Sequence, residues 1–463
     1  MTLPPQNSII GIWGFGRVGK SATAFFHARG YKLAVMDSNR NISSDNFIKE
    51  HAIPVYHQSE HDAFFSYCSY VLVSPGIDIR PCKEHAHQWI SELDLFYALW
   101  QKPIIAITGS IGKTTTTSIL TQLCHHNNIP VACGGNIGIP MLDLLPQRDT
   151  AAYAVLEVSS FQLEHCVSFA PDIALITNIH ANHLDRHETL ENYWHAKARI
   201  FAHQQKKQHL LAPLTLRERI NECNFKSNLW HLSNTIPSDQ ELKAFSPDEN
   251  IVWHTETAIT LYRTMNYQTF QLPKALFACT FPMNALAVYS MFHIMQQVTN
   301  NEAIQNNFDC DYVSYPHRLE LVATVNNITF VNDSKSTTIA STLAALERYN
   351  HAQIILLLGG LSKGANREEL IAQLPRSVIF VACFGAEALQ LAAWCAHYGF
   401  AHQIGNTLDE AFKVAYAHAT ANSTLLLSPS GSSFDLYENY EKRGEHFRTL
   451  VHQFEKQYPP QQL

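Results

Sequence analysis

One glycine-rich stretch constrains this chain more than any other. Residues 108–115 (TGSIGKTT) follow the apolar run 104–107 and precede an amphipathic segment, so we expect strand, turn and helix. A glycine turn at a helix N-terminus brings backbone N–H groups to a phosphate, a lysine neutralises it, and a threonine hydroxyl can bind Mg²⁺. The stretch lacks the first glycine of a full Walker sequence, because Ile107 stands five residues before Gly112. We predict a nucleoside triphosphate site, with a structural turn as the alternative, made by Gly109, Ser110, Ile111, Gly112, Lys113, Thr114 and Thr115.

A second glycine loop lies near the start of the chain. The pattern predicts a strand over 8–13, a helix over 18–29 and a strand over 32–36 that ends at Asp37, with Gly14, Gly16 and Gly19 in the first turn. Taken alone, this pattern fits a nicotinamide cofactor, another nucleotide or a structural turn. A simple dehydrogenase leaves the phosphate loop at 108–115 unexplained. Two nucleotide-type pockets in one chain indicate a nucleotide-carrying substrate that is activated by phosphoryl transfer.

The rest of the chain alternates strand and helix patterns, which favours mostly parallel sheets. Residues 205–280 are polar and rich in Gln and Asn, and their pattern is the hardest to interpret. At about 150 residues per domain, 463 residues predict three α/β domains. We place a Rossmann-like domain at 1–98, a central P-loop ATPase-like domain at 99–313 and a C-terminal Rossmann-like α/β domain at 314–463. The expected elements are strands 70–73, 104–107, 153–158, 172–177, 353–358, 377–384 and 423–430, a hairpin of 319–325 with 328–333, and helices 91–100, 284–297, 336–348 and one from Tyr440 onward.

Composition excludes several classes of protein. The formal net charge is −7 and no block of Lys or Arg stands out, which argues against nucleic-acid binding. Ten cysteines without a CxxC pair indicate reduced thiols. No signal peptide or run of 18 apolar residues is visible. We therefore expect a cytoplasmic monomer that binds neither nucleic acid nor membrane.

Motifs between residues 9 and 450 resemble those of the Mur ligase family. They are SPG (74–76), GSIGKTT (109–115), GGNIG (134–138), LEVSSFQLE (156–164), NIHANHLDRH (178–187), YWHAKARIF (193–201), PHRLE (316–320), NDSKST (332–337), LLGGLSKGA (357–365) and LSPSGSSFD (427–435). The resemblance implies an ATP-dependent ligase that makes an amide through an acyl phosphate. GGNIG with LEVSSFQLE favours those members that add D-glutamate to UDP-N-acetylmuramoyl-L-alanine.

The resemblance also implies roles for single residues. Lys113 matches the γ-phosphate clamp, and two Mg²⁺ ions are expected on Thr114, Glu157, His183 and a Lys197 that is carbamylated by CO₂. ATP would further contact Asn284 on the adenine side, Arg318 at the phosphates and Asp333 at the ribose. The uridine diphosphate part of the substrate would bind Gly14, Phe15, Gly16, Arg17, Val18, Asp37, Ser74, Pro75, Gly76 and Asn136. D-Glutamate would bind Lys335, Thr337, Lys363, Ser433 and Tyr440, since two lysines and hydroxyls suit a dicarboxylate.

Other functions remain open on the sequence alone. Within the same fold, the runner-up is a ligase for another amino acid and precursor, including an L-alanine-adding, tripeptide-completing or folylpolyglutamate-forming enzyme. A second class is a non-catalytic nucleotide sensor, against which the four residues Lys113, Glu157, His183 and Lys197 argue. A third class is a nicotinamide dehydrogenase. The sequence departs from the family pattern at Ser110-Ile111, Arg17-Val18, Asn39 and Leu361-Ser362.

Overall fold

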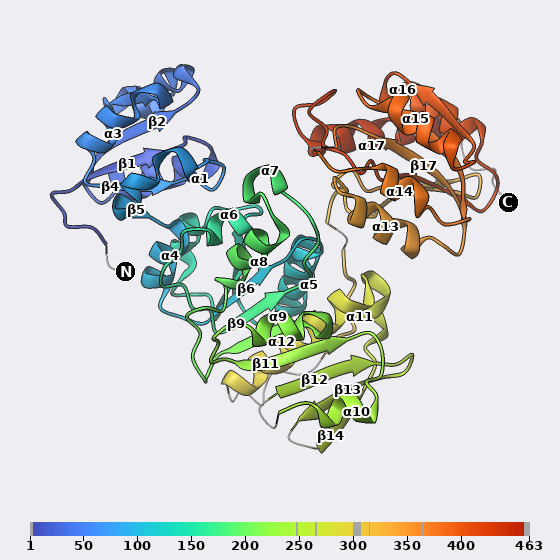
Figure 1. Ribbon diagram of the computed structural model, residues 1–463, viewed down its shortest axis with the longest axis horizontal. Helices are drawn as coiled ribbons and strands as arrows, with labels where there is room; N and C mark the ends of the chain where they lie inside the picture. The colour runs from blue at the N-terminus through green and yellow to red at the C-terminus, as the bar shows by residue number, and fades with distance from the viewer. Residues whose placement is uncertain are drawn as a thin grey trace. The chain divides into compact units, whose positions relative to one another are not determined.

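The computed structural model describes residues 3–246, 249–263, 266–299, 307–313, 315–362 and 364–457. The chain divides into two compact units, Met1–Tyr312 and Val313–Leu463. The first unit contains a five-stranded and a nine-stranded sheet, and the second contains a six-stranded sheet (Figure 1). The α/β class and the mostly parallel sheets are as predicted, whereas the boundaries at residues 98 and 313 stay a prediction.

The first sheet has the strand order β3-β2-β1-β4-β5, and all its pairs are parallel. Its glycine loop joins β1 to α1, and the apolar run of β1 is buried between the helices. Parallel strands place their carboxyl ends at one edge, so the loops after β1, β2 and β4 lie together. The elements are β1 (Ile9–Trp13), α1 (Arg17–His27), β2 (Lys32–Asp37), α2 (Asn46–Glu50), β3 (Val55–His57), α3 (His61–Tyr67), β4 (Tyr70–Val73) and β5 (Trp89–Ile90).

The second sheet has the order β14-β13-β12-β11-β10-β9-β6-β8-β7. It is parallel from β7 to β12 and antiparallel at β13 and β14. Five of its strands come from the polar segment 205–280, whose exposed edge strand β14 carries little apolar signal. The strands are β6 (Ile104–Thr108), β7 (Val131–Gly135), β8 (Tyr153–Glu157), β9 (Ile173–Ile176), β10 (His209–Pro213), β11 (Asn228–Ser233), β12 (Glu249–His254), β13 (Ala258–Arg263) and β14 (Asn266–Gln271).

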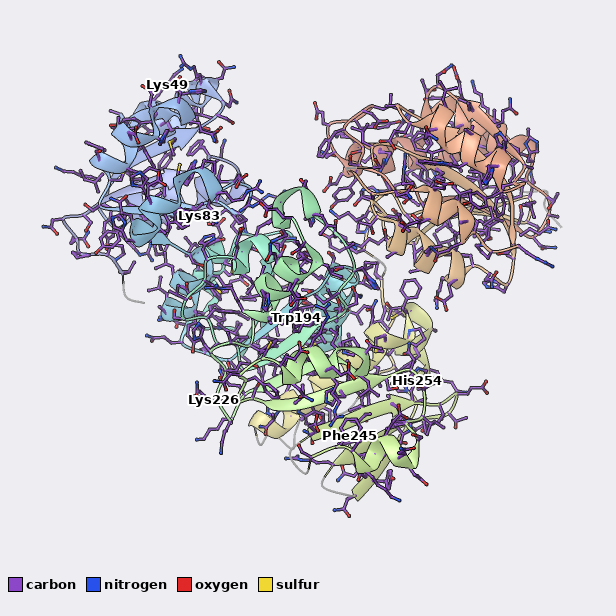
Figure 2. The ribbon with its side chains drawn as sticks, in the orientation of Figure 1. Lys49, Lys83, Trp194, Lys226, Phe245 and His254 are labelled. Carbon is purple, nitrogen blue, oxygen red and sulfur yellow. The ribbon has the colours of Figure 1, made fainter. Side chains whose placement is uncertain are left out.

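Helices cover both faces of this sheet. Successive side chains of β6 point to opposite faces, and on each face they are buried under helices. Ile105 and Ile107 pack toward α5 and α12, while Ile104 and Ala106 pack toward α4 and α8. Trp194 of α8, labelled in Figure 2, is buried in the second of these cores. The helices are α4 (Glu92–Trp100), α5 (Lys113–His126), α6 (Ser160–Leu163), α7 (Leu184–His187), α8 (Leu190–Ala198), α9 (Arg217–Asn221), α10 (Asp239–Lys243), α11 (Lys274–Cys279) and α12 (Pro282–Thr299).

The second unit has the strand order β15-β16-β20-β17-β18-β19. The predicted hairpin is present as the antiparallel pair of β15 and β16, and the other pairs are parallel. Thr338 caps α13, so this helix begins three residues later than predicted. The elements are β15 (Glu320–Val325), β16 (Ile328–Asn332), α13 (Ile339–Arg348), β17 (Gln353–Gly359), α14 (Glu368–Ala372), β18 (Val378–Phe384), α15 (Ala388–His397), β19 (His402–Gly405), α16 (Leu408–Ala417), β20 (Ser423–Leu427) and α17 (Tyr440–Gln457).

Candidate active site

The phosphate loop joins β6 to α5, at the point where β6 lies between β8 and β9. Gly109 has φ 141° and Gly112 has φ 86°, conformations that side chains other than glycine disfavour. A Cβ atom on Gly112 would lie 2.7 Å from Oδ1 of Asn284, which places this predicted adenine-side asparagine against the loop. Lys113 begins α5 and folds back, since its Nζ donates to the carbonyls of Gly109 at 2.7 Å and Ser110 at 3.0 Å. The predicted strand, turn and helix are therefore present.

The end of β9 holds the phosphate loop in shape. Asn178 accepts from the Ile111 amide at 2.9 Å and donates to the Ile111 carbonyl at 3.1 Å. The Thr177 hydroxyl donates to the same carbonyl at 2.5 Å. The Ser110 hydroxyl donates a hydrogen bond to the His180 carbonyl and accepts one from the His180 amide. Sequence reasoning missed Thr177 and Asn178, although Asn178 opens the motif NIHANHLDRH.

Glu157 is a buried carboxylate at the carboxyl end of β8. The hydroxyl of Thr114 donates to its Oε2 at 2.6 Å, and the amide of Asn136 donates to its Oε1 at 2.7 Å. Both of these donors are neutral, and none of the ion pairs in the described ranges involves Glu157. A buried carboxylate is stable when a cation or a metal compensates it. The carboxylate and the Thr114 hydroxyl therefore form a fitting pair of oxygen ligands for a hard cation.

Lys197 of α8 is buried beside Thr108, the last residue of β6. Its side chain is 1% exposed, and Nζ donates to the Thr108 hydroxyl at 3.2 Å and lies 4.7 Å from the centre of the Tyr193 ring. Burial, together with the neighbouring charge of Lys113, lowers the pKa of Lys197 well below that of an ordinary lysine, and Glu157 opposes this shift. The surroundings of this amino group thus disfavour the charged ammonium form relative to a neutral amine or a covalently modified nitrogen.

His183 precedes the short helix α7 and has φ 55°. Its ring packs edge-on against Phe161 with the ring centres 5.0 Å apart. In the described part of the chain, no three His, Cys, Asp or Glu side chains come together as a ready-made metal cluster. A cation beside Glu157 would therefore take other ligands as well, such as a hydroxyl, a modified lysine, phosphate oxygens or water.

The first glycine loop makes a separate candidate pocket. Asp37 accepts from the Phe15 amide at 2.7 Å and from the Asn39 amide at 2.8 Å, so its carboxylate shapes the loop. The Ser74 hydroxyl donates to the Gly14 carbonyl at 2.8 Å, which joins the two predicted walls of the pocket. Arg17 donates to the Gly138 carbonyl at 3.1 Å and so links this loop to GGNIG. Of the remaining predicted residues of this pocket, Gly16, Pro75 and Gly76 lie in the same two loops, and Val18 lies in the first turn of α1.

Asp333 follows the end of β16, in the second unit, and is buried. It accepts from the Ser428 hydroxyl at 3.0 Å and from the Leu319 amide at 3.2 Å. Burial raises the pKa of this carboxyl group to about 7, against the lowering influence of the hydrogen bonds and of Arg318. Arg318 and Asp333, both predicted to contact ATP, are thus neighbours.

Of the predicted glutamate-binding residues, Lys335 and Thr337 lie in the loop after β16, Ser433 lies in the loop after β20, and Tyr440 begins α17. Nζ of Lys335 lies 3.6 Å from the centre of the Tyr440 ring. Thr337 is half-buried and Ser433 is buried in the loop after β20. Lys363 lies outside the described residues.

Two buried arginines that the sequence reasoning missed hold these loops. Arg443 donates to the Ser334 carbonyl at 2.7 Å and to the Gly431 carbonyl at 3.0 Å. Arg367 donates to the Gly359 carbonyl at 2.8 Å and pairs with Glu387 at 2.7 Å. Both lie in polar stretches outside the quoted motifs, where a buried arginine has no local sequence signal.

Three domain descriptions match successive parts of the chain. Residues 8–88 match the N-terminal domain described as Mur ligase MurD-like, residues 107–292 the Mur ligase middle domain, and residues 317–431 the Mur ligase glutamate ligase domain. The UDP-N-acetylmuramoylalanine--D-glutamate ligase of Lawsonia intracellularis is 30% identical over 452 residues, which are 96% of this chain and 94% of the relative. The chain belongs to the Mur ligase family.

Other Mur ligase relatives match along nearly their whole length too. The ligase of the same name from Haemophilus influenzae (strain ATCC 51907) is 30% identical over 457 residues, 96% of this chain and 98% of that one. Among solved structures, a MurF ligase from Thermotoga maritima in complex with ADP has a TM-score of 0.55 at 14% identity and covers 97% of this chain and 96% of its own. A pseudomurein peptide ligase type C from Methanothermus fervidus has a TM-score of 0.55 at 16% identity and covers 97% and 100%. These likenesses confirm the predicted Mur ligase fold.

The predicted family is thus confirmed, and the dehydrogenase reading is not needed to explain either glycine loop. None of the helices in the described ranges has both the length and the hydrophobicity to cross a bilayer. The roles assigned to single residues, the monomeric state and the absence of a nucleic-acid partner stay predictions.

Proposed function

We propose that this Mur ligase adds D-glutamate to UDP-N-acetylmuramoyl-L-alanine, with conversion of ATP to ADP and phosphate. The observation that carries the ligase chemistry is the cluster of Lys113, Thr114, Glu157 and Lys197 around one phosphate loop. The choice of substrates rests on the relatives, which are named for this reaction over almost the full length of the chain. A nucleotide sensor would have no use for a buried carboxylate and two lysines beside its triphosphate.

The chemistry requires two displacements. A carboxylate oxygen of the precursor attacks the γ-phosphorus of ATP, and the bond from that phosphorus to the ADP oxygen breaks. The amine of D-glutamate then attacks the acyl carbon, loses a proton, and phosphate leaves with the former carboxylate oxygen. Lys113, at the N-terminus of α5, would stabilise the charge on the γ-phosphate oxygens.

Mg²⁺ fits the oxygen pair of Thr114 and Glu157, because the carboxylate is buried and its two hydrogen-bond donors, Thr114 and Asn136, are neutral. Bound there, the metal would neutralise phosphate charge. We assign the second predicted ion to the side of His183 and Lys197. Asn136, which bonds Glu157, would orient this carboxylate and link it to the sugar side of the substrate.

We further propose that Lys197 acts as a carbamate. The lone pair of neutral Nζ would attack the carbon of CO₂ and the nitrogen would lose a proton, so that the cation is replaced by an anion with two oxygens. Burial supports this assignment, because it disfavours the ammonium form and Lys113 disfavours it further. An anion would compensate both Lys113 and a divalent ion.

D-Glutamate would bind the loops of the second unit. Lys335 is held beside Tyr440, and Ser433 and Thr337 supply hydroxyl groups. Lys363 would complete the set of donors for two carboxylates. Fixing both carboxylates leaves one orientation for the amine, which is the reason to expect selection of the D enantiomer.

Phosphate release tests this function directly. Release should require ATP, Mg²⁺, the UDP-linked precursor and D-glutamate together, and L-glutamate, L-alanine and meso-diaminopimelate should be poor replacements. Lys113→Ala should abolish release with an unchanged thermal midpoint. Lys102→Ala should retain phosphate release, because Lys102 is a half-buried lysine that donates to the backbone carbonyls of Asp149 and Ala151. Equal turnover of the two glutamate enantiomers would contradict the substrate assignment, and an active Lys113→Ala protein would contradict the role of the loop.

A further inference from the structure

The guanidinium group of Arg186 joins three segments that are distant in sequence. It pairs with Glu164 at 2.6 Å, lies 4.7 Å from the centre of the Phe161 ring, and donates a long bond of 3.4 Å to the Pro75 carbonyl. Its side chain is only 9% exposed. Pro75 belongs to the loop after β4 in the first sheet, whereas Arg186 lies in α7 near the second sheet. The residue thus crosses between the two sheets of the first unit.

A second arginine crosses in the opposite direction. Arg80 follows the same loop after β4 and forms an ion pair with Asp78 at 2.7 Å. It forms a second ion pair at 3.0 Å with Glu188, which follows α7 near the second sheet. These groups are more exposed than Arg186, so we assign the larger share of the link to the buried pair of Arg186 and Glu164.

The segment that carries Arg186 has a strained backbone. Its helix α7 spans only four residues, and the residues before and after it, His183 and Glu188, have φ 55° and φ 68°. Such conformations cost free energy in residues other than glycine and persist when surrounding contacts hold them. Arg186 supplies such contacts from within the turn, and His187 adds a 3.0 Å bond to Ser160.

We propose that Arg186 is a positioning residue that couples the precursor loop at 74–76 to the turn that carries His183. This inference rests on the proposed function for the identity of the loop's ligand. Glu164 orients the guanidinium group, and Phe161 supports it from one face while also packing against His183. When the precursor orders the loop at 74–76, the carbonyl of Pro75 would hold Arg186 and, through it, the strained turn beside the reaction centre.

Two matched substitutions separate this role from general stability. Arg186→Gln removes the ion pair with Glu164 and the hydrogen bond to Pro75. Arg186→Lys keeps the positive charge but loses the planar guanidinium group, whose two terminal nitrogens donate to Glu164 and to Pro75. Arg199→Gln is the control, because Arg199 donates to the Cys166 carbonyl without reaching the first sheet. Hydrogen exchange of the amides in 74–80 and 183–188 is measured on the full chain without ligand, next to the thermal midpoint.

Arg186→Gln should speed hydrogen exchange in both segments by roughly tenfold, and Arg186→Lys should speed it by less. Arg199→Gln should leave the exchange rates of both segments unchanged. In the turnover assay, both Arg186 variants should raise KM for the UDP-linked precursor by about tenfold while KM for ATP stays within about twofold. Unchanged exchange at 74–80 in a folded Arg186→Gln protein would overturn the coupling, whatever reaction the protein catalyses. A wild-type protein that releases no phosphate would instead contradict the proposed function and leave the exchange result to decide the coupling.

Discussion

At the scale of single residues, the site depends on charges that the protein interior would not hold without compensation. Glu157 and Lys197 are both almost fully buried, yet their hydrogen bonds and ring contacts within the described residues are with hydroxyl, amide and aromatic groups. Removing water raises the free energy of an unpaired charge by several kcal/mol. Ions and modifications that restore neutrality therefore have a strong driving force here.

Lys197 gives a prediction that depends on this compensation. Lys197→Ala should be nearly inactive, because the carbamate oxygens would be lost, and added short carboxylates should restore part of the rate. The measurement is phosphate release with increasing formate or acetate, and Lys206→Ala, an exposed lysine, serves as the control. An active Lys197→Ala protein without added carboxylate would disprove the assignment.

Glu92 gives a prediction about pH and stability. It is buried, its Oε1 accepts from the Met141 amide at 3.1 Å, and its Oε2 has no hydrogen-bond partner among the described residues. Burial raises the pKa of this carboxyl group to about 7. The folded protein thus holds a proton that the unfolded chain releases near its ordinary pKa of 4.5, so this residue's stabilising contribution is lost as the pH rises from about 4.5 to 7.

Glu92→Gln should remove that loss, because an amide stays neutral. Thermal midpoints of the two proteins should agree near pH 4.5 and diverge as the pH increases, until the variant is more stable at pH 8 by up to about 3 kcal/mol. Asp333, whose pKa is also raised, is present in both proteins and cancels in the difference. A difference in midpoint that stays constant with pH would show that Glu92 ionises normally.

At the scale of elements, each site begins where a strand ends and a helix starts. The loop from β1 to α1 is the tightest example, because Gly14 has φ 92° and Gly19 lies in the first turn of α1 directly over it. A Cβ atom on Gly19 would overlap the carbonyl oxygen of Gly14. The close approach of this helix to its loop therefore requires glycine at that position.

Gly19→Ala should accordingly destabilise the first unit, since backbone must move to admit one methyl group. Gly16→Ala is the matched control for stability, because a Cβ atom there meets nothing within 4 Å and its φ is −74°. We expect a lower thermal midpoint for Gly19→Ala, by several degrees for a loss of about 2 kcal/mol, and an unchanged midpoint for Gly16→Ala. Equal midpoints for all three proteins would mean that the helix can shift at little cost.

At the scale of the whole molecule, the two units have separate interiors. The hydrophobic clusters of Val313–Leu463 are built from β15 to β20 and their helices, and among the described residues none of these clusters includes a residue of Met1–Tyr312. The candidate phosphate loop lies in one unit and the candidate glutamate residues lie in the other. The residues that we propose for the reaction are thus distributed over both units.

A fragment of residues 313–463 should fold alone, because its core needs no side chain from the first unit. We expect a cooperative thermal transition in calorimetry and a near-ultraviolet circular dichroism spectrum typical of fixed aromatic rings. The complementary fragment 1–312 should bind ATP without releasing phosphate, which the assay for the full chain can measure. A fragment 313–463 that melts without a cooperative transition would show that the units stabilise each other.

The sequence alone determined the local parts of this protein. Strand and helix periods, together with glycines at turns, predicted both nucleotide loops, the hairpin of β15 with β16 and the helices α4 and α12, because these patterns depend on neighbours within a few residues. The family resemblance of the motifs then pointed to Glu157, His183 and Lys197 without any geometry.

The tertiary structure decided what no local pattern contains. The five strands between residues 205 and 280 gain their stability from pairing along a nine-stranded sheet, so their polar sequence carries little signal of its own. Contacts such as Thr114 with Glu157 and Arg186 with Pro75 join residues that are far apart in the chain. Burial of Lys197, and the low pKa that follows from it, arises only when α8 packs beside β6, because the free energy of a charge depends on everything that surrounds it.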